Sequence, residues 1–352
     1  MRRLPLNQIT NEMQLARPIY HNNRLILNKG TKNLSHYVKG LNNLGIFSVY
    51  IEDSFSDGIE IQDAISEETL NECRMALASA FDSLLKQGNF NIEKIDETID
   101  SIIDELFSRE DILVSLNQIS SISDNTFVHS INTTVLSLLI GKELGLSRSE
   151  MKKLSEGAIL HDIGKIALDQ SILFKAGRLT DEEFNHIKLH PEYGYEIVKK
   201  NPLLTESARQ IALQHHERMD GSGYPKGLTS DEIHLFGKIV AIADMFDALT
   251  TERCYRKSMS NFHAYKILTN DASNNKIDST LLALLLKNVA IYPNGIIVHL
   301  SDGSMGVVKS QNPELPFHPV VRVIKNDGDS GQVAIFDVDL KKSINLTIVE
   351  PD

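Results

Sequence analysis

The sequence predicts a protein of several domains that is mainly α-helical. We expect an all-α domain in the middle, a small N-terminal α/β module, and a small C-terminal β domain that is either a barrel or a sandwich. Three observations support this fold class. The chain has 352 residues, which is enough for two or three domains. Residues 112–290 repeat helix-start signals, and short β-rich runs separated by turns begin after Pro293.

The first 55 residues mix short strand-like runs with one helix. Phe47–Ile51 alternates as a strand does, and Tyr37–Leu44 has a helical pattern that ends at Gly45. We therefore predict a small α/β module over residues 1–55. The Ser, Asp and Gly residues that follow it are typical of a linker.

Residues 56–111 are predicted to hold this linker and a pair of helices. Apolar residues recur at helical spacing from Leu70 to Leu84 and again from Ile92 to Leu106, with Asn91 placed to cap the second helix. The pair carries no residues suited to chemistry, so we expect it to serve in packing. Its Ile-rich second helix favours a homodimer.

The predicted all-α domain spans residues 112–290, and the predicted β domain spans residues 291–352. In the first, three Ser or Thr residues precede a Glu at capping-box spacing: Ser147 with Glu150, Thr180 with Glu183, and Thr229 with Glu232. Gly145 stands where a preceding helix would end. In the second, five short runs have strand character: 296–300, 305–309, 320–324, 333–336 and 344–349.

The net charge and the amino-acid composition indicate which binding partners and which cellular compartment to expect. The net charge of −11 argues against a protein that coats a nucleic-acid polymer, although a small anionic ligand held by a few arginines stays open. Cys73 and Cys254 have no spacing typical of disulfides or zinc modules, so we expect two ordinary buried thiols. No apolar run approaches the roughly 20 residues of a membrane-spanning helix. We therefore expect a cytoplasmic protein without a membrane partner.

The most unusual stretch of the chain is His215–Pro225, with the sequence HHERMDGSGYP. Two adjacent imidazoles followed by acids, bases and a Gly-Ser-Gly turn indicate a metal site that runs into a substrate-contacting loop. A polar helix end followed by an ordinary surface turn would have the same composition. Residues elsewhere in the chain are needed to distinguish these two interpretations.

Further metal-ligand residues occur in the predicted helical domain. Together with the adjacent pair they number seven: His129, His161, Asp162, His190, His215, His216 and Asp244. Imidazole nitrogen and carboxylate oxygen are ligands for Mn, Fe or Zn, and one carboxylate can bridge two ions. Neighbours on a helix diverge by about 100°, so His161 and Asp162 can approach one centre from different sides.

These motifs, taken in order, closely resemble those of the HD-GYP family, a branch of the HD metal-dependent phosphohydrolases. The resemblance covers about residues 125–270 and rests on six segments: His129, HDIGK at 161–165, HPE at 190–192, HHE at 215–217, DGSGYP at 220–225, and DMFDALT at 244–250 with Arg253 nearby. It implies that all seven residues above are metal ligands, with Asp162 bridging two ions. It also implies two divalent ions, with Fe or Mn favoured and Zn, Ni, Co and Mg left open.

The substrate that the resemblance implies is cyclic di-GMP, which a metal-activated hydroxide would open to linear pGpG; whether the reaction stops there or continues to GMP is left open. Asp162 and Lys165 correspond to catalytic residues. Lys165, Arg253 and Arg256 correspond to residues at the phosphates. Tyr224 lies in the loop after which the family is named, where it either contacts the substrate or braces the loop and a protein partner; we favour bracing.

Some residues depart from the family pattern or stay ambiguous. Some members have a Glu four residues before the first His, which completes a third metal site, whereas this chain has Asn125 there with Asp124 beside it. We therefore expect two ions. Asp220 orients either the loop or a ligand histidine, and Asp247 is expected to be a structural helix residue.

Three functions are compatible with this pattern. The leading hypothesis is a two-metal cyclic di-GMP phosphodiesterase. The second is a receptor that binds cyclic di-GMP with little turnover and contacts signalling proteins through the GYP loop, although a complete ligand set favours the enzyme. The third is a hydrolase of another cyclic dinucleotide.

Overall fold

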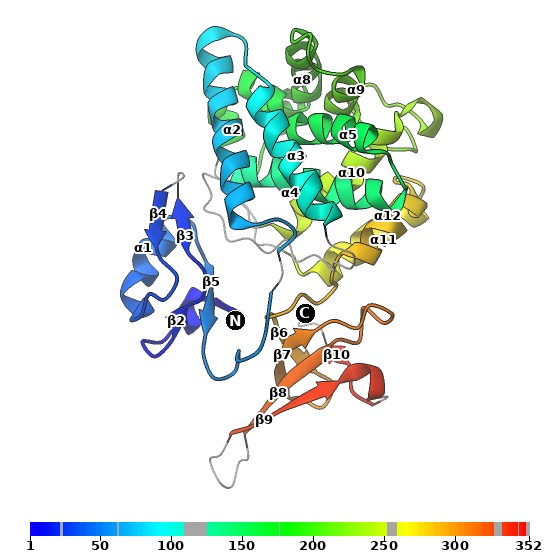
Figure 1. The fold of residues 1–352 in the computed structure, drawn as a ribbon. Coiled ribbons are helices and arrows are strands. Elements are labelled where there is room, and N and C mark those ends of the chain that lie inside the picture. Colours follow the sequence, from blue (N-terminus) through cyan, green and yellow to red (C-terminus); the bar gives the residue numbers. More distant parts are fainter. Residues whose placement is uncertain are drawn as a thin grey trace. The chain divides into compact units, whose positions relative to one another are not determined.

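The computed structural model describes residues 1–21, 24–61, 63–108, 125–175, 177–251, 259–326, 333–343 and 345–349, and these form two compact units (Figure 1). Unit 1 combines described residues from 1–63 with those from 289 to 349. Unit 2 combines residues 64–108 with described residues from 125 to 288. The N-terminal module and the C-terminal strands thus belong to one unit, and the helical pair belongs to the other.

Unit 2 is helical throughout, which confirms the predicted all-α character of this part. Its elements are α2 (Glu67–Gln87), α3 (Glu93–Phe107), α4 (Asn125–Glu143), α5 (Arg148–Leu160), η4 (Ile163–Ala167), α6 (Gln170–Leu173), α7 (Asp181–Ile187), α8 (His190–Lys199), α9 (Glu206–Gln214), η5 (Ser230–Glu232), α10 (Leu235–Thr250), α11 (Asn261–Ser273) and α12 (Ser279–Asn288). The label η marks a 3₁₀ helix.

Two of the three predicted capping boxes start α-helices, and the third starts only a 3₁₀ turn. The boxes at Ser147 and Thr180 begin α5 and α7. The box at Thr229 forms as predicted, but the chain becomes extended again before α10. The reason is tertiary, because the backbone N–H of His234 donates to Oε1 of Gln214, 2.8 Å away, instead of continuing the helix.

The helical pair packs inside unit 2, where α3 contacts both α2 and α5 (Figure 1). Ile95, Ile99, Ile102 and Ile103 on α3 are completely buried within this unit. The Ile-rich face that favoured a homodimer is therefore not available to a second copy, and that argument for a dimer is wrong. Cys73 is buried as expected, whereas Cys254 lies outside the described residues.

The N-terminal part of unit 1 is a small α/β module. Its elements are β1 (Arg2–Pro5), η1 (Leu6–Gln8), β2 (Gln14–Leu15), β3 (Ile19–His21), β4 (Arg24–Leu27), η2 (Leu34–Tyr37), α1 (Val38–Asn43) and β5 (Ser48–Glu52). The strand predicted at Phe47–Ile51 corresponds to β5, which lies between β1 and β2 in a three-stranded antiparallel sheet. Strands β3 and β4 form a separate hairpin.

The C-terminal part of unit 1 is a single antiparallel sheet. It consists of β6 (Ile297–Leu300), β7 (Met305–Ser310), β8 (Val320–Asn326), β9 (Val333–Asp339) and β10 (Ile348–Val349), in the order β10-β6-β7-β8-β9, with η6 (Leu340–Lys342) after β9. All five predicted strand runs are present, in one sheet rather than two facing ones. The backbone joins this part to the N-terminal module, since the N–H of Arg3 donates to the carbonyl of Gly295 at 2.9 Å.

Among the helices in the described ranges, none combines the length and the apolar composition that crossing a membrane requires.

We predict that Ile99→Ala lowers the free energy of unfolding of unit 2 by about 2–5 kcal/mol, because it leaves a cavity at a fully buried position on α3. Urea denaturation followed by far-ultraviolet circular dichroism measures the change. Lys94→Ala on the exposed side of the same helix is the control, with an expected change within about 0.5 kcal/mol. Equal effects of the two substitutions would contradict the packing of α3.

Candidate metal centre

The seven residues predicted to bind metal lie together in unit 2, although they come from five separate segments of the chain. They form two groups in which the candidate ligand atoms lie within 4.8 Å of one another: Asp162, His190, His215 and His216 in one, and His129, His161 and Asp244 in the other. All are buried except His216, which is half-buried. The metal-site interpretation of the adjacent histidines is therefore favoured over an ordinary helix end.

Two glycines allow the helices that carry these residues to approach closely. A Cβ atom at Gly164 would lie 2.0 Å from the carbonyl oxygen of His190 and 2.4 Å from the nitrogen of Gly194, so η4 packs directly on the α8 backbone. A Cβ atom at Gly157 would lie 2.2 Å from Cδ1 of Ile211, so α5 packs directly on α9. The end of α5, the start of α8 and the end of α9 therefore meet at one place.

Backbone carbonyls orient three of the imidazoles. Nδ1 of His161 lies 2.7 Å from the carbonyl oxygen of Ala158, and Nδ1 of His190 lies 2.8 Å from that of Ile187. Nδ1 of His215 similarly lies 3.0 Å from the carbonyl of Ala212. Because a carbonyl can only accept, each Nδ1 carries the hydrogen, and each neutral ring keeps its lone pair on Nε2.

The Nε2 atoms face one another and the two aspartates. Nε2 of His190 lies 3.2 Å from Nε2 of His215, and two nitrogen lone pairs at this distance repel unless a cation lies between them. Within the described residues, Nε2 of His161 and Oδ1 of Asp162 are buried without a hydrogen-bond partner, which is costly unless another group binds them. A set of nitrogen and carboxylate ligands in this state fits divalent transition metals.

Both aspartates span the two groups. Oδ1 of Asp162 lies 3.3 Å from Nε2 of His190, whereas its Oδ2 lies 3.4 Å from Nε2 of His161. Oδ1 of Asp244 lies 3.0 Å from Nε2 of His129, whereas its Oδ2 lies 3.7 Å from Nδ1 of His216. Each carboxylate therefore has one oxygen directed at each group, as a bridging ligand requires.

Electrostatics keep these groups in their metal-binding forms. Burial raises the pKa of Asp162, but the charge of Lys165 and the neighbouring His161 outweigh burial and hold this pKa well below its usual range. Burial raises the pKa of Asp244 too, but its interactions with His129, His216 and His161 outweigh burial and hold this pKa well below its usual range. Burial together with neighbouring histidines holds the pKa of His215 well below its ordinary value. The centre therefore contains ionised carboxylates and a neutral imidazole, the forms that bind metal.

Asp247, expected to be a structural helix residue, has a specific contact with the candidate metal centre. Its Oδ2 lies 2.6 Å from Nδ1 of His129, and its Oδ1 accepts hydrogen bonds from Asn132 at 2.8 Å and from Thr251 at 3.0 Å. Asp247 therefore orients the His129 ring, as backbone carbonyls orient the rings of His161, His190 and His215. The available sequence signal was its position three residues after Asp244, on one face of the same helix.

The GYP loop folds back on the residues just before it. The buried carboxylate of Glu217 accepts hydrogen bonds from the backbone N–H groups of Lys226 at 2.7 Å and Leu228 at 2.9 Å. A Cβ atom at Gly223 would lie 2.3 Å from the nitrogen of Arg218, so only glycine allows this approach. Sequence reasoning assigned Glu217 no role, and its loop partners nine and eleven residues away left no short-range pattern.

Tyr224 and Asp220 both support structure in this loop. The ring of Tyr224 packs against the imidazole of His216, with centroids 4.7 Å apart and planes inclined by 32°. The backbone N–H of Tyr224 donates to the carbonyl of His216 at 3.2 Å. Oδ1 of Asp220 accepts from the N–H and the hydroxyl of Ser222, at 3.0 and 2.6 Å. These contacts favour bracing for Tyr224 and loop orientation for Asp220.

The remaining predicted residues are only partly placed. Nζ of Lys165 lies 2.5 Å from Oδ2 of Asp162, inside the cluster. Arg253, Arg256 and Asp124 lie outside the described residues, and Asn125 is described only as the first backbone position of α4.

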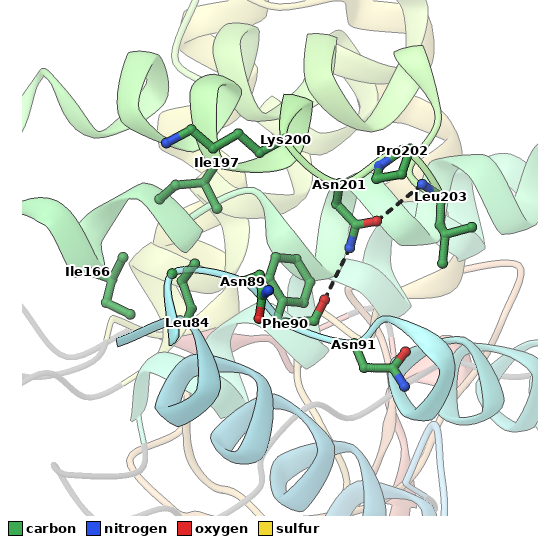
Figure 2. Close-up of a pocket in the computed structure, with 11 residues that line it drawn as sticks. Leu84, Asn89, Phe90, Asn91, Ile166, Ile197, Lys200, Asn201, Pro202 and Leu203 are labelled. Carbon is green, nitrogen blue, oxygen red and sulfur yellow. Dashed lines mark hydrogen bonds between the residues drawn. The ribbon is translucent and has the colours of Figure 1, made fainter. Parts of the chain in front are cut away.

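A cavity of about 600 Å³ lies elsewhere in unit 2 (Figure 2). It is bounded by the turn between α2 and α3, by η4, and by the end of α8. The amide of Asn201 closes one side, where it donates to the carbonyl of Phe90 and accepts from the N–H of Leu203. None of the seven candidate ligands lines this cavity.

The buried cluster of His and Asp side chains lies where several α-helices meet, and this arrangement defines the class as an HD-type helical protein. The chain belongs to the HD domain family, which matches residues 100–281, and its ordered motifs identify it as an HD-GYP member. Residues 297–352 match a second family, described as the KOW domain associated with HD domain. Both matches agree with the helical and strand-rich parts of the structure.

Several known proteins are similar to this chain. Cyclic di-GMP phosphodiesterase PA4108 of Pseudomonas aeruginosa is 31% identical over 227 residues, which cover 64% of this chain and 54% of that protein. The cyclic di-GMP phosphodiesterase response regulator RpfG of Xanthomonas campestris pv. campestris is 48% identical over 122 residues, or 34% and 32% of the two chains. The 3′3′-cGAMP-specific phosphodiesterase 2 of Vibrio cholerae is 36% identical over 175 residues, or 49% and 34%. The chain spans about half or less of the length of these relatives.

We predict that Asp247→Asn lowers metal affinity about 10–100-fold, because an amide facing Nδ1 of His129 favours the tautomer whose Nε2 carries hydrogen. Elemental analysis after dialysis against a series of chelator concentrations measures the loss. Asp231→Asn, at an exposed aspartate in η5, should leave metal content unchanged. Full metal retention by Asp247→Asn would show that His129 needs no such partner.

Proposed function

We propose that this chain hydrolyses cyclic di-GMP and opens it to linear pGpG. The observation that carries this proposal is the pair of aspartates, each with one oxygen toward each histidine group. Two ions held by such a set would polarise a phosphodiester and activate water. The relatives named for cyclic di-GMP hydrolysis support the choice of substrate.

The chain's own residues prepare this chemistry. The anchored imidazoles hold Nε2 toward the cluster before any ligand arrives, so no reorganisation of the rings is needed at the moment of reaction. Lys165 places a positive charge beside Asp162, where charge develops on a bound phosphate. In this proposal Arg253 and Arg256 bind the phosphates, and Tyr224 braces His216.

The proposed cofactors are two divalent ions, with Fe or Mn preferred because nitrogen and carboxylate ligands suit both. The two ligand groups support this number. Asn125 stands where a third site would need a carboxylate, so this chain is proposed to lack a third ion.

A second substrate is favoured by one observation. The relative from Vibrio cholerae is specific for 3′3′-cGAMP by name and matches half of this chain. Hydrolysis of mixed cyclic dinucleotides would use the same metal centre, because the phosphodiester is the same and only a base differs. Assays should therefore compare the two nucleotides directly.

We predict that metal-loaded protein converts cyclic di-GMP to pGpG, and that Asp162→Asn reduces kcat about 100-fold or more, because it removes a charged ligand from both groups. Chromatography of the products measures both effects, with metal content determined for each sample. Asp231→Asn serves as the unaffected control. Tight binding without turnover under Fe or Mn would instead identify a receptor.

A further inference from the structure

We propose that Lys188 positions the substrate, and that its ammonium group contacts the second phosphate of a cyclic dinucleotide while the first lies at the metal centre. The inference rests on the proposed function, because only a substrate with two phosphates needs this contact. Lys188 lies outside the family motifs quoted above and is not one of the seven candidate metal ligands.

The backbone of Lys188 lies beside the metal centre. The residue follows the last residue of α7 and stands two positions before His190, the first residue of α8. The carbonyl of Ile187, the preceding residue, accepts the hydrogen bond from Nδ1 of His190. The chain on both sides of Lys188 is therefore tied to a candidate metal ligand, which limits how far its side chain can move from the centre.

Two aromatic rings hold the ammonium group. Nζ of Lys188 lies 4.7 Å from the ring centroid of Phe184 and 5.8 Å from that of Tyr224. Both distances are within the range of cation–π attraction. Because the ring of Tyr224 packs on the imidazole of His216, this contact directs the positive charge toward the side of the centre formed by the GYP loop.

The charge of Lys188 is not neutralised by the described parts of the chain. No described carboxylate forms an ion pair with its ammonium group, and the hydrogen bond from this group to Oδ1 of Asn185 is long at 3.4 Å. Lys165 differs, since its ammonium group contacts Asp162 at 2.5 Å. Of these two lysines, Lys165 is paired with a carboxylate of the cluster, whereas Lys188 has no carboxylate partner among the described residues.

Substrate geometry explains why such a cation is useful. A cyclic dinucleotide carries two phosphodiesters, and only one of them can occupy the metal centre during cleavage. The other anionic group must be held outside the cluster, and a lysine provides a point charge for it. A half-buried lysine gains more from this contact than an exposed one, because screening by water is weaker there.

The test compares Lys188→Met and Lys188→Arg with wild-type protein. We expect Lys188→Met to raise KM for cyclic di-GMP about tenfold with a small change in kcat, the loss typical of one charge-assisted hydrogen bond. Lys188→Arg keeps the charge and should restore KM to within about threefold. Lys199→Met is the matched control, because Lys199 also lies over a tyrosine ring, 5.5 Å from the centroid of Tyr195, and is not near a candidate ligand in sequence.

A substrate with one phosphodiester separates this role from a structural one. Bis(p-nitrophenyl) phosphate has a single phosphodiester and serves as this substrate. In Lys188→Met, we expect kcat/KM for cyclic di-GMP divided by kcat/KM for bis(p-nitrophenyl) phosphate to fall about tenfold. An unchanged KM for cyclic di-GMP would overturn the inference and leave the proposed function intact. An equal loss on both substrates would overturn it as well, since Lys188 would then act only by bracing Tyr224. If wild-type protein cleaves bis(p-nitrophenyl) phosphate but neither binds nor cleaves cyclic di-GMP, the proposed function fails, and this inference fails with it.

Discussion

The hydrogen bonds at Nδ1 are the constraint on which the centre depends. Ala158, Ile187 and Ala212 supply backbone carbonyls, and Asp247 supplies a carboxylate. Each partner fixes one ring, its tautomer and the direction of its Nε2 lone pair. The result is a buried concentration of lone pairs and carboxylate oxygens that is unfavourable by itself and becomes favourable when cations bind. Metal binding and the local fold are therefore coupled.

The carbonyls can serve in this way because helices end at the centre. Within the last turn of a helix the carbonyls lack partners in the helix itself, and a histidine placed just after that turn can donate to one of them. His161 follows α5 and His215 follows α9, each at the position that closes its helix. The glycines at 157 and 164 then bring these helix ends close enough to share ions. The same geometry places the GYP loop directly beside the candidate ligands, where Tyr224 packs on His216.

Much of the fold followed from local patterns. The boxes at Ser147 and Thr180 marked true helix starts, and the β-rich runs after Pro293 became strands of one sheet. The wrong predictions share one cause: a local sequence pattern does not show which residues from other parts of the chain will contact it. The Ile-rich face of α3 is covered by the chain's own helices. The box at Thr229 yields to a contact with Gln214 from α9.

The sequence by itself determined the chemistry of this protein: seven histidine and aspartate residues as candidate metal ligands, the spacing of their motifs and the family to which they belong. These properties are local, because residue type sets ligand chemistry and neighbours in the chain set motif spacing. Only the tertiary structure decided which groups act together. It divided the ligands into two sets spanned by Asp162 and Asp244, made Asp247 the partner of His129, and placed Lys188 beside Tyr224. The physical reason is that these contacts join separate segments of the chain, such as those of His129 and Asp247, 118 positions apart, and such contacts form only when helices pack.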